Sequence, residues 1–231
     1  MARSLFCGVT ASLVALTLSC VAVQATEVDP EIIAAQTGTW LVAPLNGKPG
    51  CSLTFTKDGT IGGFVVTGAD SCGATLPGLT EVNAWNFDDG GLVLIDSLRN
   101  VKARFHESEG SPWQTQGDPA MALVLPPGDI DRLPTQASLS GTWVLKRPAG
   151  EVLCTLTLKA STTDGEDGSV SPAGDCAATV TKLKLAYWQI NTFDVTLMAG
   201  DGGTLGFTMT ADGNFEKIKE EGGKPLLMVR Q

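Results

Sequence analysis

The stretch GTWLVAPLNGKPGCSLTF, residues 38–55, returns in altered form as GTWVLKRPAGEVLCTLTL, residues 141–158. In both stretches a cysteine follows the tryptophan by eleven residues. Further landmarks recur at offsets of 103 or 104 residues: Trp40 with Trp143, Cys51 with Cys154, Cys72 with Cys176, Trp85 with Trp188, and Gly110 with Gly213. Repetition at a fixed period predicts two copies of one domain of roughly 90–100 residues each.

The strand signal within each copy has a period of two. Cys51, Leu53 and Phe55 fall on one face of a strand and the intervening polar residues fall on the other, and residues 154–158 repeat that phase. Other short strand candidates are 62–67, 91–96, 101–106, 120–125, 194–199, 204–210 and 225–230, and glycine-rich turns separate them. Such a pattern predicts an all-β sandwich or barrel. We favour two closed barrels, because closure removes exposed strand edges.

The N-terminal segment and the local composition of the chain indicate a signal peptide, a trunk, two domains and a linker. Arg3, an apolar run over 5–18 and small residues before Ala25 predict a signal peptide over 1–25, cut after Ala25, and hence a periplasmic or secreted protein. A membrane anchor is the first alternative, although the run is short for a span. Lipidation at Cys20, in Leu-Ser-Cys, is the second. The expected divisions are a trunk over 26–37, domains over 38–127 and 141–231, and a Pro- and Gly-containing linker over 128–140.

The charge of the mature chain argues against two classes of partner. Removal of residues 1–25 leaves 15 basic and 25 acidic side chains, a formal charge of −10. An acidic domain repels nucleic acid and anionic lipid, so we expect neither to bind. No later apolar run approaches the length of a membrane span.

Four cysteines remain in the mature chain, two in each copy. Pairing within copies, Cys51 with Cys72 and Cys154 with Cys176, is the simplest of three connectivities, and export makes disulfides chemically plausible. Each bridge should contribute about 3 kcal/mol by the loop-closure estimate. A zinc site is the alternative, but the sequence has no CxxC pair and a single histidine.

Motifs for catalysis are missing from the sequence. His106 is the only histidine and falls near the end of an expected strand, where a solvated side chain is the simplest interpretation. GxSxG, HExxH, P-loop and GxGxxG motifs do not occur. The acidic run DGEDGS, residues 164–169, does not fit a calcium loop and is expected to be a solvated loop. We therefore expect no enzyme and no cofactor, and a function that resides in binding.

The repeated Gly-Thr-Trp, cysteine and second tryptophan, together with the glycine-punctuated tail over 200–231, resemble the bacterial metalloprotease inhibitors of the alkaline proteinase inhibitor (Inh) family. The resemblance covers 38–126 and 141–231. It implies lipocalin-like, eight-stranded up-and-down barrels with one disulfide each and no metal of their own. It also implies a monomeric inhibitor whose partner is a bacterial extracellular zinc metalloprotease of the serralysin type.

In that family the free N-terminal segment enters the protease cleft and its first residue reaches the catalytic zinc. Carried onto this sequence, the protease-binding trunk is Thr26, Glu27, Val28, Asp29 and Pro30. Asp29 as N-cap and Pro30 at the first helical position predict one or two helical turns after the trunk. Only the first copy offers a free N-terminus, since the second is tethered through residues 135–140.

The tryptophans have structural interpretations. Trp40 and Trp143 are expected to plug the barrel bases, and Trp85 and Trp188 to lie in the core or wall. Trp113 aligns with Glu216 by offset, so it is a possible contact residue in a polar turn, or else packs over the barrel mouth. Alternatives to inhibition are an envelope structural or adhesion module and a barrel that binds a small apolar ligand.

Overall fold

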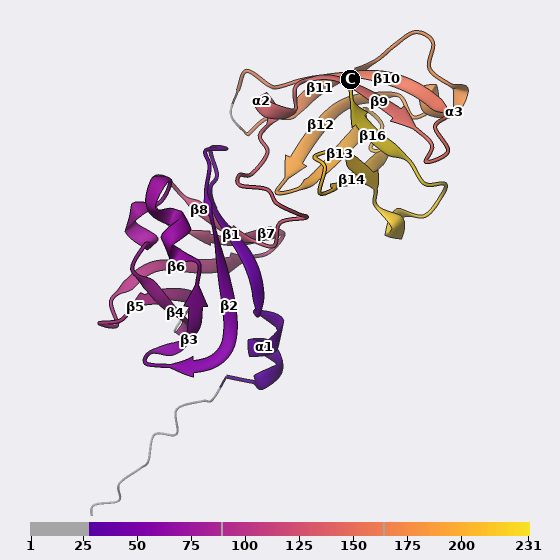
Figure 1. The fold of residues 1–231 in the computed structure, drawn as a ribbon. Coiled ribbons are helices and arrows are strands. Elements are labelled where there is room, and N and C mark those ends of the chain that lie inside the picture. Colours follow the sequence, from indigo (N-terminus) through magenta and orange to yellow (C-terminus); the bar gives the residue numbers. More distant parts are fainter. Residues whose placement is uncertain (1–27, 89, 164) are drawn as a thin grey trace, which may run out of the picture.

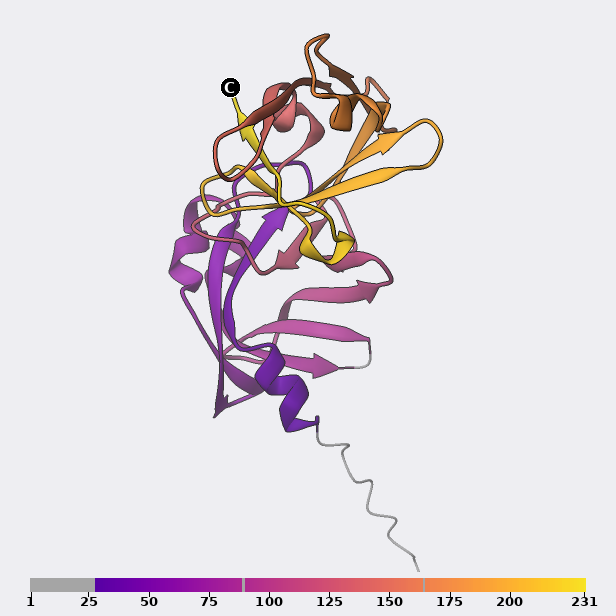
Figure 2. The same cartoon turned by 90° about the vertical axis from the view of Figure 1, so that its right-hand side faces the viewer.

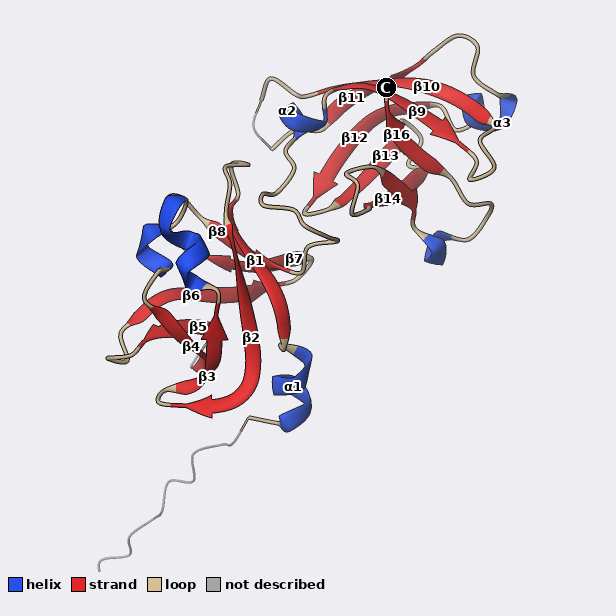
Figure 3. Cartoon of the chain, in the orientation of Figure 1, coloured by secondary structure: helices blue, strands red, loops and turns tan. Residues whose placement is uncertain are grey.

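The computed structural model describes residues 28–88, 90–163 and 165–231. These residues form two closed eight-stranded antiparallel barrels in tandem, linked by a segment that contains a short helix (Figures 1 and 3). The first barrel comprises β1 (Gly38–Pro44), β2 (Cys51–Thr60), β3 (Gly63–Thr67), β4 (Val82–Asp88), β5 (Gly91–Asp96), β6 (Val101–Ser108), β7 (Ser111–Thr115) and β8 (Met121–Val124). The second comprises β9 (Gly141–Lys146), β10 (Val152–Lys159), β11 (Gly168–Pro172), β12 (Leu185–Asn191), β13 (Asp194–Ala199), β14 (Thr204–Met209), β15 (Phe215–Lys217) and β16 (Leu227–Arg230).

Each strand pairs with the next along the chain, and the last strand of each barrel pairs with the first. The two copies share their register: Trp40 lies opposite Leu53 in the β1–β2 pair, and Trp143 lies opposite Leu156 in the β9–β10 pair. The repeat, the all-β class and the closed up-and-down topology expected from the sequence are therefore confirmed.

Buried tryptophans organise the interior of both barrels. Trp85 and Trp188 have no exposed surface, and the indole Nε1 of each donates to a main-chain carbonyl at 3.0 Å, that of Thr56 and that of Lys159 respectively. A buried indole needs such a partner, because an unpaired N–H would lose its hydrogen bond to water. The interpretation of these two residues as core residues is correct.

The first barrel contains a continuous row of aromatic rings. Trp40 stacks near Phe55 at a centroid distance of 6.1 Å, and Phe55 stacks on Trp85 at 5.5 Å. Phe87 meets Trp85 edge-on at 5.8 Å and extends the row to Trp113 at 6.2 Å. Side chains thus fill the middle of the barrel, in the manner of a packed core.

Both expected disulfides are present. Cys51 is bonded to Cys72, and Cys154 to Cys176. The first bridge ties the start of β2 to the 3₁₀ helix η1 (Ala69–Ala74), and the second ties β10 to the turn that precedes α3 (Ala178–Thr181). Each bridge therefore ties the segment between the third and fourth strands of its barrel to the second strand.

The linker over 128–140 has structure of its own and contacts the first barrel. It contains the helix α2 (Gln136–Leu139), and Leu133, which is 5% exposed, packs with the outward-facing Leu41 and Val124 of the first barrel. The Gly50 N–H donates to the Asp131 carbonyl at 2.6 Å, which joins the linker to the first barrel. As a result β1 is buried on both faces from Trp40 to Pro44.

Two further points concern the remaining sequence expectations. The acidic run over 164–169 is not a loop throughout, because Gly168 and Ser169 belong to β11, and Asp164 lies outside the described residues. Within the described part of the chain, no helix is both long enough and apolar enough to cross a bilayer. The expected signal peptide and Cys20 also lie outside the described residues.

Candidate functional site

The segment that enters the first barrel forms the helix α1 (Pro30–Ala35). Asp29 caps it, since its Oδ1 accepts the Glu31 N–H at 2.8 Å, and Pro30 occupies the first helical position. Glu31 places a carboxylate in the first turn, where the helix dipole favours negative charge. The helix and its N-cap agree with the sequence expectation.

A tryptophan of β1 holds the C-terminal end of α1 on the barrel. The Trp40 Nε1 donates to the Gln36 carbonyl at 2.8 Å, and Trp40 itself is 7% exposed. Ile33 packs against the barrel core, whereas Ile32 faces outward with 49% of its surface exposed. The helix therefore rests on the barrel along one side and presents an apolar side chain to solvent on another.

The helix α1 lies away from the second barrel. In both views of the chain, α1 lies at the end of the first barrel that is remote from the second barrel (Figures 1 and 2). Val28, half-buried, is the first residue described, and Thr26 and Glu27 of the expected trunk lie outside the described residues. Thus Val28, Asp29 and Pro30 lead directly into a helix that is attached to the barrel.

The second copy has the same attachment but no free end. The Trp143 Nε1 donates to the Leu139 carbonyl of α2 at 2.8 Å, at the position equivalent to Gln36. Thr135 and Ser138 form a reciprocal capping box at the start of α2. Trp40 and Trp143 are both buried, and each joins the preceding helix to the first strand of its barrel. The chain reaches α2 through the linker.

Trp113 occupies a different environment from the one expected. It lies within strand β7, not in a polar turn, and it is half-buried against the core. Trp113 pairs with Leu123, and Phe215 pairs with Met228 at the same place in the second barrel, so Phe215 is its counterpart. The alignment of Trp113 with Glu216 was wrong, because the β5–β6 and β13–β14 hairpins differ by one residue. Protease contact by Trp113 stays a prediction.

His106 lies in β6, and its Nδ1 is 3.0 Å from the Gly90 carbonyl oxygen. Among the residues that the structure describes, no group of three or more His, Cys, Asp or Glu side chains is placed to hold a metal ion.

Comparison with known proteins gives one family. A protein-family model described as "Protease inhibitor Inh" matches residues 33–126 and again residues 133–230. Both matches begin within or just before the helix that precedes each barrel. A search of curated proteins gives no match.

Proposed function

Because the chain belongs to the Inh family of protease inhibitors, we propose that it inhibits secreted zinc metalloproteases of the serralysin type by inserting its N-terminal trunk into the protease cleft. The first barrel serves as the platform for the trunk. The second barrel extends the platform and contributes no trunk of its own.

The observation that carries this proposal is the attachment of α1 to the first barrel. Asp29 caps the helix, Trp40 holds its end through the Gln36 carbonyl, and Ile33 packs on the core. A segment that extends from a fixed helix loses less conformational entropy on binding than one at the end of a free tail. The arrangement therefore favours a trunk presented in a limited range of directions.

The chemistry of a free N-terminus suits a zinc site. An α-amine has a pKa near 8, so it can lose its proton near neutral pH and coordinate a metal ion. The residues behind it offer main-chain N–H and carbonyl groups, which can pair with a strand that borders a protease cleft. This mechanism requires that cleavage after Ala25 exposes Thr26.

We assign different roles to the two acidic residues of the trunk that precede α1. The Asp29 carboxylate is engaged with the Glu31 N–H, so its charge serves the helix. Glu27 is then the acidic trunk residue left to face a protease. We infer that the target tolerates or pairs one negative charge near the zinc.

Location in the periplasm or outside the cell is part of the same proposal. Two disulfides in a chain of this kind are typical of an oxidising compartment. The apolar N-terminal run provides the export signal.

Trimmed trunks test the mechanism. We expect the mature chain from Thr26 to inhibit a serralysin-type protease, and a chain that lacks residues 26–28 to lose at least a hundredfold in inhibition constant. The shorter chain keeps Asp29 and Pro30, so α1 retains its cap and the melting temperature should not change. Intact mass of the native protein checks that Thr26 is the first residue.

N-terminal acetylation of the mature chain is the matched control. It blocks the amine and leaves every side chain in place, so inhibition should fall as in the trimmed chain. Undiminished inhibition by the trimmed chain would rule out the trunk mechanism, and a native N-terminus at an acylated Cys20 would do the same. If trimming abolishes inhibition but acetylation does not, the trunk enters the cleft and its amine is not needed for inhibition.

A further inference from the structure

The two barrels differ at the same strand edge, because the second barrel closes it and the first leaves it open at one residue. In the second barrel, the chain that follows β15 continues to pair with β14: the Ile218 N–H donates to the Gly206 carbonyl at 3.0 Å. The Gly206 N–H in turn donates to the Glu221 carboxylate, at 3.0 and 2.9 Å from its two oxygens. Both main-chain groups of Gly206 are therefore satisfied by the barrel's own chain.

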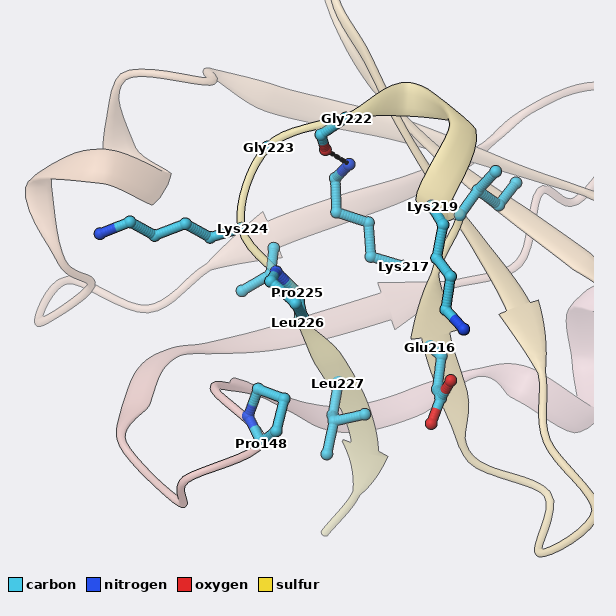
Figure 4. Close-up of a pocket in the computed structure, with 11 residues that line it drawn as sticks. Pro148, Glu216, Lys217, Lys219, Gly222, Gly223, Lys224, Pro225, Leu226 and Leu227 are labelled. Carbon is cyan, nitrogen blue, oxygen red and sulfur yellow. Dashed lines mark hydrogen bonds between the residues drawn. The ribbon is translucent and has the colours of Figure 1, made fainter.

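The loop that supplies this carboxylate is held in shape by its own contacts. Lys217 Nζ donates to the Gly222 carbonyl, as the close-up shows, while Lys219 and Lys224 extend away from it (Figure 4). Gly222 has a positive φ of 68°, which lets the chain turn back towards β16. Only Ile218 continues the pairing with β14, and the 3₁₀ helix η3 (Lys219–Glu221) then turns the chain so that the Glu221 carboxylate reaches Gly206.

Register identifies the equivalent position in the first barrel. Ala103 lies opposite Leu94, and Leu205 lies opposite Leu197, so Arg104 takes the place of Gly206. Here β7 ends at Thr115, and residues 116–119 leave the barrel wall instead of pairing with β6. Among the residues that the structure describes, no group bonds to the Arg104 N–H or carbonyl on this side.

A groove occupies the space left by the missing pairing. It has a volume of about 470 Å³ and runs between the 101–104 part of β6 and the 116–119 loop. Lys102, Arg104 and His106 line one side of it, and Asp118 lies on the other. The edge of a strand with unpaired main-chain groups is a template for an added strand.

Charge favours an acidic occupant. Two cationic side chains, Lys102 and Arg104, line the groove, although the mature chain as a whole carries a formal charge of −10. Lys102 also contacts Glu81 at 2.5 Å and Asp96 at 3.4 Å, and Arg104 contacts Asp88, which partly offsets the positive charge. These carboxylates belong to β4, β5 and the turn before β4, so they border the strand on the side away from the groove.

We propose that the β6 edge at Arg104 binds a segment of a partner protein that pairs with Arg104 at one residue and then makes a single helical turn, with a glutamate three residues after the pairing residue. The spacing is that of Ile218 and Glu221 in the second barrel. The incoming N–H bonds the Arg104 carbonyl, and the glutamate accepts the Arg104 N–H. This surface is separate from the trunk and does not depend on protease inhibition.

The chain itself provides the probe. A synthetic peptide FEKIKEEG, the sequence of residues 215–222, is titrated into the full mature protein labelled with nitrogen-15. We expect the largest changes in amide chemical shift at Arg104 and Gln116. A peptide with Gln in place of the residue equivalent to Glu221 should bind about tenfold more weakly, because it loses a charge-assisted hydrogen bond.

Two variants of the protein complete the test. Arg104→Gln should weaken peptide binding at least threefold, whereas Lys146→Gln, which removes one positive charge from the second barrel, should leave it unchanged. Neither variant should change inhibition of a protease by the trunk, so this inference and the proposed function fail separately. Shifts confined to the β14 edge, or no shifts at millimolar peptide, would overturn the inference, as would equal affinity for the Glu and Gln peptides.

Discussion

The first strand of each barrel carries one tryptophan. Replacing each of the two by phenylalanine separates an effect on stability from an effect on inhibition. Trp40→Phe and Trp143→Phe both remove an indole N–H that donates at 2.8 Å to the last turn of the preceding helix. Both side chains are almost fully buried, at 7% and 1% exposure. The two variants therefore remove the same chemical group. They differ in the segment before the helix, which is the trunk for α1 and the linker for α2.

The expected loss of stability follows from these contacts. The lost hydrogen bond contributes about 1 kcal/mol net. The smaller ring leaves a void that costs about 1 kcal/mol more. A total of about 2 kcal/mol should lower the melting temperature of a domain of this size by roughly 10 °C.

Inhibition should respond to only one of the two variants. If Trp40 holds α1 in the position that presents the trunk, loss of about 1 kcal/mol from that attachment should raise the inhibition constant about fivefold. Trp143→Phe should leave the inhibition constant within twofold of the parent. Calorimetry gives the stabilities, and titration of a serralysin-type protease well below the melting temperatures gives the constants.

Equal losses of inhibition in the two variants would refute the reasoning, because α2 leads to no free end. A Trp40→Phe protein that is destabilised as expected and inhibits like the parent would also refute it. In that case the trunk would act independently of its helix.

Three other changes give direct tests. Replacing both cysteines of the Cys51–Cys72 bridge by serine should lower the free energy of unfolding by about 3 kcal/mol in chemical denaturation, since the bridge closes a loop with a sequence separation of 21. Gln36→Met should raise the melting temperature by a few degrees, because the buried Gln36 Oε1 has no hydrogen-bond partner among the described residues and an unsatisfied oxygen costs about 1 kcal/mol or more. Hydrogen bonds from the Thr210 hydroxyl and a neighbouring amide lower the pKa of Asp212 to about 2, and a carbon-13 titration should report that value and a higher one in Thr210→Val. Because the folded pKa lies below the unfolded one, Asp212 stabilises the protein above about pH 4 and loses this contribution as the pH falls through 2.

The sequence repeat predicted the fold well because its landmarks are core positions. Trp85 and Trp188 need the same carbonyl partner in each copy, and the cysteines need the same separation, so these residues stay at a nearly constant offset. The alternation over Cys51 to Phe55 likewise reflects one buried face. Closure and disulfide pairing followed from these few positions.

Other features depend on contacts that an offset does not reveal. The one-residue difference between the β5–β6 and β13–β14 hairpins displaced Trp113 from its true counterpart, Phe215, and only strand pairing shows it. The helix α2 had a local signal, because Thr135 and Ser138 have the spacing of a capping box, but the Pro- and Gly-containing surroundings indicated a loop. The open edge at Arg104 could not be foreseen, since the Glu221 carboxylate that closes the other edge is distant from β14 in sequence.

The burial of β1 on both faces makes the order of the two copies in the chain significant. Leu41 and Ala43 are fully buried, and they belong to a hydrophobic cluster that includes Leu133 of the linker and core residues of the second barrel. Their equivalents on β9 are Val144 and Lys146, which are half-buried. Lysine at position 43 would bring an ammonium group to this buried cluster, where an unpaired charge is costly. The two halves of this duplicated protein are therefore no longer interchangeable, and each carries the sequence that its place in the chain requires.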